Sequence, residues 1–269
     1  MSIECEYPIP FVAKVTINNP ARRNALGEAE FRALAKLWPT LNADTDIRVI
    51  VLCGAGDLAF CAGADLGAGL EHLADINDTV NNALLKTAVF SKPIIAAING
   101  HCVAGGLELV LSTDIRIAAS SARFGFPEVK WGIIPSGGGA LKLAAQIGHL
   151  RAMEMLLGAE LKSALWAKEI GLVSEVVDGA DAALKRAMAV AERLAGYAPC
   201  ALQATKRLAA ESTRAEVLRL GSLEADVLAL VRTTDERAIG TAAFLSKTAP
   251  QYMTPPRFLA PQHEKTCGR

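Results

Sequence analysis

The stretch Pro93–Ser120, PIIAAINGHCVAGGLELVLSTDIRIAAS, decides the fold class of this chain. Its first part, Pro93–Asn99, is a short apolar run, and Asp114–Ser120 is a second one. Such runs are typical of strands that are buried on both faces. Between them, AGGLELVLS (Ala104–Ser112) predicts a short helix. The alternation of strand, helix and strand indicates an α/β domain with an internal sheet.

The segments on both sides continue this alternation. We expect strands at Val12–Ile17, which alternates apolar and polar residues before a turn, and at Ile47–Cys53, which is β-branched and continuously apolar. Apolar residues at helical spacing predict a helix over Glu28–Asn42, and a second helix is expected over Ile76–Phe90, after a loop-rich stretch. Beyond Gly137 the pattern is nearly all helical.

Composition excludes several classes of protein. The chain has 269 residues and balances 28 Lys and Arg against 28 Asp and Glu, so bulk electrostatics would not draw it to nucleic acid or an anionic membrane. The longest stretch without a charged residue, Pro93–Leu107, is shorter than the roughly 18 residues that span a bilayer. Aromatic residues make up only 5%, which is few for a protein that stacks on sugars or bases. These features predict a globular protein with a large core, since 51% of its residues are hydrophobic.

Cysteine and histidine usage argues against secretion and against a metal site. The six cysteines form no C-x-x-C pair, and the N-terminus MSIECEYPIP has no basic and apolar signal segment. We therefore expect reduced thiols and a cytoplasmic protein. The four histidines lie far apart and make no zinc-binding grouping, so no metal is predicted.

The segment Gly54–Ala59 matches the letters of a dinucleotide-binding loop, G-x-G-x-x-A, but not its context. A phosphate-binding loop must open directly into a helix, whereas LAFCAGADLGAGL has no helical period. Asp57 and Asp65 would also face the pyrophosphate with like charge. We therefore do not expect a dinucleotide-binding loop at this segment.

Two other loops are more informative, because each follows a buried strand and is rich in small residues. They are Cys61–Leu66, CAGADL, and His101–Leu109, HCVAGGLEL. Gly105 is expected to begin a short helix, where free amides favour an anion. Two such amides that converge on one point make an oxyanion hole, which stabilises an enolate or tetrahedral oxygen. The alternative is a pair of tight turns that need glycine.

Two glutamates are the candidate acid and base. Glu108 lies one helical turn after Gly105 in a helix that is apolar nearly all round, where a carboxylate is costly unless it is paired or faces a cavity. Its alternative role is to satisfy the helix dipole. Glu128 lies in the non-periodic loop Phe124–Gly139, where by itself it would be a solvated charge with Lys130 as its partner.

Taken together, these segments resemble the crotonase, or enoyl-CoA hydratase/isomerase, superfamily, and in motif they are most similar to enoyl-CoA hydratase. The likeness extends from about Phe11 to Thr248. The blocks that carry it occur in the family's order and spacing: NPARRNAL, FCAGADL, PIIAAINGHCVAGGLELVLSTDIRIA, FGFPEVKWGIIPSGGG, AKEIGLVSEVV and GTAAFLSKTAP.

The resemblance implies an α/β fold with a ββα-spiral core and a helical C-terminal trimerisation region. We divide the chain accordingly into a core over residues 1–195, a helical region over 196–250 and an irregular tail over 251–269. The resemblance also implies a homotrimer or a dimer of trimers.

The implied reaction adds water syn across the double bond of a trans-2-enoyl-CoA and gives a 3-hydroxyacyl-CoA. One carboxylate must take a proton from water while another supplies one to C2. By resemblance, Glu108 activates the water, Glu128 is the protonated acid, and the amides of Ala64 and Gly105 hold the thioester oxygen. An apolar surrounding would keep Glu128 protonated. Family isomerases often keep only the second glutamate, so the presence of both favours a hydratase.

The substrate contacts implied by the resemblance are the following. The acyl pocket is assigned to Phe126, Trp131, Pro135 and Gly137. Phe126 stands where the family's hydratases often have Gln, and Pro135–Gly139, PSGGG, replaces a more usual PGAGG; both departures bear on acyl specificity and on the reaction. CoA is assigned to Arg22, Arg23, Ala62, Asp65, Leu66, Phe244 and Lys247. Phe244 and Lys247 match a helix that, in the family, closes the CoA site of a neighbouring subunit. No separate cofactor is expected, because CoA is part of the substrate.

Other functions stay open at this point. An isomerase that shifts a 3-enoyl-CoA to a 2-enoyl-CoA would use Glu128 alone. A glycosidase could use two carboxylates, but the low aromatic content argues against it. A non-enzymatic RNA-binding relative would need a basic comb along one helix, whereas Lys185-Arg186 and Lys206-Arg207 are isolated pairs.

Overall fold

Two sheets form the centre of the protein in this computed structural model, which describes residues 2–68, 75–88 and 90–253. The strands of the first sheet are β1 (Ser2–Ile9), β2 (Val12–Asn18), β3 (Val49–Gly54), β5 (Ile94–Ile98), β7 (Ile115–Ala119) and β10 (Glu175–Val177). The strands of the second are β4 (Ala59–Cys61), β6 (His101–Val103), β8 (Arg123–Gly125) and β9 (Lys162–Ser163). The strand orders are β1-β2-β3-β5-β7-β10 and β4-β6-β8-β9. Pairing is parallel except for the pairs β1–β2 and β8–β9.

The chain passes from the first sheet to the second three times, from β3 to β4, from β5 to β6 and from β7 to β8. Glycine allows the close approach at these passages. A Cβ on Gly54 or on Gly100 would lie 2.4 Å from a backbone oxygen, of Phe60 and Leu58 respectively. The buried Asn99 side chain donates to the carbonyls of Gly56 (2.7 Å) and Ala59 (3.0 Å) and so satisfies the backbone there. This repeated crossing builds the ββα spiral that the family resemblance implied.

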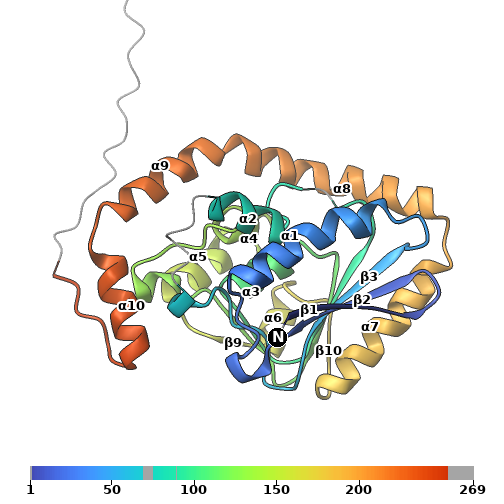
Figure 1. The fold of residues 1–269 in the computed structure, drawn as a ribbon, viewed down its shortest axis with the longest axis horizontal. Coiled ribbons are helices and arrows are strands. Elements are labelled where there is room, and N and C mark those ends of the chain that lie inside the picture. The colour runs from blue at the N-terminus through green and yellow to red at the C-terminus, as the bar shows by residue number, and fades with distance from the viewer. Residues whose placement is uncertain (1, 69–74, 89, 254–269) are drawn as a thin grey trace, which may run out of the picture.

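Helices surround the two sheets. They are α1 (Glu28–Ala43), α2 (Ile76–Ala83), α3 (Gly105–Val110), α4 (Gly139–Ile147), α5 (His149–Gly158), α6 (Ala164–Glu169), α7 (Ala180–Ala195), α8 (Pro199–Arg219), α9 (Gly221–Arg232) and α10 (Glu236–Ser246). Single 3₁₀ turns are η1 (Pro20–Arg22), η2 (Leu66–Ala68) and η4 (Glu128–Trp131). Figure 1 shows α8 and α9 running nearly end to end along the upper side of the molecule.

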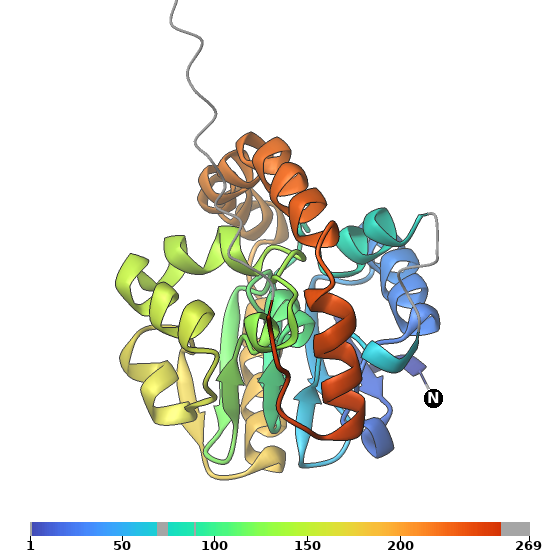
Figure 2. The same ribbon diagram turned by 90° about the vertical axis from the view of Figure 1, so that its left-hand side faces the viewer.

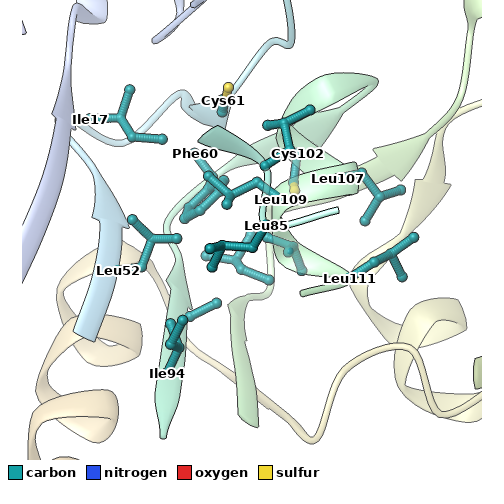
Figure 3. Packing of buried hydrophobic residues seen from close by; sticks show 14 of the residues in the cluster. Ile17, Leu52, Phe60, Cys61, Leu85, Ile94, Cys102, Leu107, Leu109 and Leu111 are labelled. Carbon is teal, nitrogen blue, oxygen red and sulfur yellow. The ribbon is translucent and has the colours of Figure 1, made fainter. Parts of the chain in front are cut away.

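The central strands of the first sheet, β3, β5 and β7, are buried on both faces, as the continuous apolar runs predict. On one face, Val51, Ile95 and Ile117 pack against the small residues of α7, among them Ala187. The alternate residues point into the main core, where side chains from both sheets and from α3 meet (Figure 3). Leu52 of β3 and Leu109 of α3 are both fully buried there. The core therefore fixes α3, which carries Glu108, against the sheets.

Helix α10 packs on η4 and η2 of its own chain, and Figure 2 shows it turning back from α9 toward the body of the molecule. Gly240 permits the contact, because a Cβ there would lie 2.1 Å from the Trp131 carbonyl oxygen. The rings of Trp131 and Phe244 meet edge to face, with centroids 5.2 Å apart. The close glycine contact lets α10 cover the site of its own chain.

The predicted α/β class and the four predicted strands are confirmed, with ends that differ by one or two residues. The helix expected over Ile76–Phe90 ends at Ala83, because Leu85 has a positive φ of 52°, a left-handed conformation that ends a helix. β1 and the short strands of the second sheet had not been predicted. Of the predicted tail, residues 254–269 lie outside the described residues.

Candidate active site

A cavity of about 500 Å³ lies between α2, α3, η4 and α9. It brings together residues that are far apart in the sequence. The predicted site residues that line it are Ala62, Ala64, Leu66, Gly105, Glu108, Glu128, Trp131, Gly137 and Phe244. Apolar side chains such as Leu84, Ile133 and Leu228 form much of the remaining wall. The cavity thus offers a largely apolar volume with the carboxyl groups of Glu108 and Glu128 on its surface.

The two predicted oxyanion amides lie side by side. The Leu26 amide donates to the Gly63 carbonyl (2.8 Å) and the Asp65 amide donates to the Leu26 carbonyl (2.9 Å). This parallel bridge leaves the amide of Ala64 pointing away from it. Gly105 is the first residue of α3, so its amide has no acceptor within the helix. An ideal Cβ on Gly105 would lie 3.6 Å from the Ala64 nitrogen. The two amides can therefore reach one oxygen atom.

Backbone strain occurs between these loops. Ala104, the residue before Gly105, has φ 49° and ψ −130°, a conformation that L-residues rarely adopt. Its amide donates to the Gly125 carbonyl (3.1 Å) and its carbonyl accepts from the Glu108 amide (2.9 Å), and these bonds hold it in place. Gly63, with φ +88°, packs so closely that a Cβ would lie 2.8 Å from that of Ala104. Strain held by surrounding contacts is common at functional sites.

Glu108 is 5% exposed and is fixed by the loop that begins α4. The Gly139 amide donates to its Oε1 at 2.9 Å, and the Gly137 amide also donates to the carboxylate. Burial raises the pKa of Glu108 to about 7, although these amides and the Lys86 ammonium favour the charged form. The group can therefore change protonation state near neutral pH, as a catalytic base requires.

Glu128 is also 5% exposed and begins the short turn η4. Its Oε2 is buried and has no hydrogen-bond partner among the described residues. Burial, together with the nearby Glu108 carboxylate, raises the pKa of Glu128 to about 8. A buried carboxyl group with an unpartnered oxygen is best accommodated in its protonated form. Glu128 is thus suited to donate a proton while Glu108 accepts one.

Lys86 and Glu224 are among the charged residues of the cavity wall that had not been predicted from the sequence. Lys86 is 8% exposed, donates to the Ser136 carbonyl at 2.7 Å and forms an ion pair with Glu224 of α9. In the sequence, Lys86 lies among apolar residues of an expected helix. Glu224 lies beside an apolar stripe that includes Leu223 and Val227. A charge in such a setting was the available signal, but their pairing required the fold.

The other predicted contacts lie outside the cavity lining. Phe126 and Pro135 pack against Gly139: a Cβ on Gly139 would lie 2.8 Å from Phe126 Cε1 and 3.0 Å from Pro135 Cβ. The remaining predicted residues are polar or charged and lie near the loop Cys61–Leu66 or at the end of α10. Arg22 forms an ion pair with Asp65 at 2.9 Å beside η2, Arg23 lies near His101, and Lys247 follows the end of α10.

Two features of the described residues bear on other classes of protein. None of their helices is both long and apolar enough to cross a membrane. In the same part of the chain, no three His, Cys, Asp or Glu residues cluster as ligands for a metal ion.

The chain is similar to known proteins over nearly its whole length. Residues 11–255 match the family Enoyl-CoA hydratase/isomerase. An enoyl-CoA hydratase, EchA19, of Mycobacterium tuberculosis is 36% identical over 245 residues, 88% of this chain and 91% of that protein. An (E)-benzylidenesuccinyl-CoA hydratase of Thauera aromatica is 39% identical over 90% of this chain and 95% of that protein. The solved structure of EchA1_1 from Mycobacterium paratuberculosis has a TM-score of 0.84 and 32% identity, and covers 93% of this chain and 98% of its own. With its spiral core, its paired loop amides and these relatives, the chain belongs to the enoyl-CoA hydratase/isomerase family, the crotonase superfamily.

Proposed function

We propose that the protein is an enoyl-CoA hydratase that adds water syn to a trans-2-enoyl-CoA and forms a 3-hydroxyacyl-CoA. The observation that carries this proposal is the pair of buried glutamates, Glu108 and Glu128, which share one cavity with the amides of Ala64 and Gly105. Hydration needs a base, an acid and an oxyanion site at one place, and these four groups supply them.

In the proposed mechanism, the thioester oxygen accepts hydrogen bonds from the Ala64 and Gly105 amides. Ionised Glu108 takes a proton from water, whose oxygen forms a bond to C3. The electrons of the double bond move toward the thioester oxygen, and the enolate is stabilised by the two amides. Protonated Glu128 then gives its proton to C2. An oxyanion hole of this kind stabilises the transition state by about 3 kcal/mol per donor.

The isomerase remains the nearest alternative, because a proton shift between C2 and C4 of a 3-enoyl-CoA requires one carboxylate. The amides of Gly137 and Gly139 hold the Glu108 carboxylate in place. This favours hydration, since an isomerase that used Glu128 alone would not need a fixed second carboxylate.

The acyl group differs among the names of the relatives. Relatives of similar identity carry names with different acyl groups, among them 2,3-dehydroadipyl-CoA hydratase of Escherichia coli and crotonyl-CoA hydratase of Syntrophomonas wolfei. These names share hydration of an enoyl thioester, which supports that reaction class here. We further propose that CoA binds along Ala62 and Leu66 with Arg22 at its phosphates, and that the protein forms trimers or paired trimers in the cytoplasm.

The test is hydration of crotonyl-CoA, followed as loss of the absorbance of its conjugated thioester. We expect turnover by the wild type and a loss of at least about a hundredfold in kcat for Glu108→Gln and for Glu128→Gln. Glu160→Gln, at an exposed surface carboxylate, is the control and should keep full activity. If the wild type leaves crotonyl-CoA unchanged but converts a 3-enoyl-CoA, and Glu108→Gln keeps that activity, the protein is the isomerase instead.

A further inference from the structure

Lys86 occupies an unusual position for a lysine. It follows the end of α2, is 8% exposed, and its ammonium group reaches the cavity wall. There it donates to the Ser136 carbonyl at 2.7 Å and pairs with Glu224 of α9, which is itself 11% exposed. Taking an ammonium group out of water is costly, so these two contacts must offset a large loss of hydration.

The Ser136 carbonyl belongs to the same peptide unit as the Gly137 amide. In a trans peptide these two groups point in opposite directions, and the structure has no cis peptide bond among the described residues. The carbonyl of this unit accepts from Lys86, while its N–H donates to the Glu108 carboxylate. A cation at the carbonyl end polarises the peptide and strengthens the donor at the other end.

Steric contacts show how tightly this peptide is held against Glu108. A Cβ on Gly137 would lie 2.5 Å from Glu108 Oε2, so the loop and the carboxylate are in close contact. Two residues further on, the Gly139 amide donates to Oε1 at 2.9 Å. A shift of the Ser136 carbonyl would therefore move the groups that fix both carboxylate oxygens.

We propose that Lys86 is a positioning residue for Glu108: it acts through the Ser136–Gly137 peptide, and Glu224 holds Lys86 in place from α9. This inference rests on the proposed function, because it assumes that Glu108 is the base of the reaction. It also gives the helical region a role in the reaction, since Glu224 of α9 keeps Lys86 at the loop that contains Ser136.

Four charged groups face Glu108 from the elements packed around it. Lys86 lowers the pKa of the carboxyl group, Glu224 raises it, and Glu128 interacts with it across the cavity. Lys142 of α4 also interacts with the Glu108 carboxylate, and its ammonium donates to the Leu85 carbonyl (2.9 Å) and Ser112 Oγ (2.8 Å). Removal of Lys86 and removal of Glu224 should therefore shift the protonation of Glu108 in opposite directions, although both break the same ion pair.

The experiment measures kcat/KM for crotonyl-CoA against pH in Lys86→Met, Lys86→Arg and Glu224→Gln. Lys86→Met should move the acidic limb of the profile upward by about half a unit or more, which lowers the rate about threefold at pH 6 relative to the plateau. Glu224→Gln should move the limb downward, and Lys86→Arg should restore it. Lys206→Met is the control, because Lys206 is a similarly buried lysine, 11% exposed, whose ion pair with Asp114 lies away from Glu108. It should leave the limb unchanged.

A merely structural ion pair would give another result: both substitutions would lower the rate by one factor at every pH, and the limb would stay in place. That outcome overturns the proposal. To separate it from a failure of the proposed function, the Glu108 carboxyl group is titrated without substrate by ¹³C NMR of glutamate-labelled protein, with Glu108→Gln for assignment. A resonance whose pKa rises in Lys86→Met supports the positioning role even if the wild type hydrates no enoyl-CoA. An unshifted resonance refutes it.

Discussion

Replacing Gly137 by alanine tests whether the loop before α4 sets the position of Glu108. The added Cβ would lie 2.4 Å from Leu84 Cδ1, 2.5 Å from Glu108 Oε2 and 2.9 Å from Glu108 Cδ. Ordinary contact begins near 3.4 Å, so relief requires a movement of about 0.9 Å, the difference between 3.4 and 2.5. The backbone itself permits alanine, because the φ of Gly137 is not positive.

A misplacement of about 1 Å in a catalytic group lowers a rate by about a hundredfold. We therefore expect Gly137→Ala to lose about two orders of magnitude in kcat for crotonyl-CoA, with a much smaller change in KM. The assay follows the loss of thioester absorbance at a temperature well below the melting temperature of the variant. Gly158→Ala is the matched control, because a Cβ there meets nothing within 4 Å. If Gly137→Ala kept the wild-type kcat, Glu108 would not depend on this loop and the argument would be wrong.

Three further predictions concern protonation and the oxyanion loops. The pH profile of kcat/KM should be bell-shaped. Activity falls below the Glu108 pKa of about 7, as the base becomes protonated, and above the Glu128 pKa of about 8, as the acid ionises. A rate that stays flat between pH 5 and 9 would contradict these roles. Because the folded-state pKa of Glu128 is raised above the usual glutamate value of 4.5, its contribution to stability is present at low pH and is lost as the pH rises to about 8. Glu128→Gln should therefore raise the melting temperature at pH 9 more than at pH 5, and calorimetry that finds equal shifts would count against a buried acid. Gly63→Ala places a Cβ 3.0 Å from the Gly105 nitrogen at a φ of +88°. It should displace the Gly105 amide of the oxyanion hole and so lower kcat by about a hundredfold. An unchanged kcat would show that this loop does not take part in the reaction.

The sequence predicted the long strands well and the short ones poorly, for a physical reason. Runs such as Ile47–Cys53 are buried on both faces, so nearly every residue is apolar. β4, β6 and β8 have three residues each, too few to show a period of two, and their passages depend on close backbone contacts at Gly54 and Gly100. Local composition carries little information on such contacts.

The candidate site likewise contains residues that the sequence indicated and residues that it did not. Glu108 could be proposed from sequence because a carboxylate in an apolar helix needs an explanation, and the structure places it on a cavity. Lys86 resembled an ordinary lysine near the end of a helix. Its partner Glu224 is 138 positions away in the chain, so only the folded arrangement of α9 brings the two together. The packing of α10 on its own chain likewise depends on the tertiary contact of Gly240 with Trp131.

Hydration of crotonyl-CoA in deuterium oxide, with the product analysed by NMR, tests the central claim most directly. If Glu108 activates the water and Glu128 gives the proton within one cavity, the product carries a single deuterium at C2, on the same face as the hydroxyl group at C3. Mixed or anti labelling would show that the two glutamates do not act together from one side. An unhydrated substrate that exchanges only its α-proton would contradict the proposed hydratase.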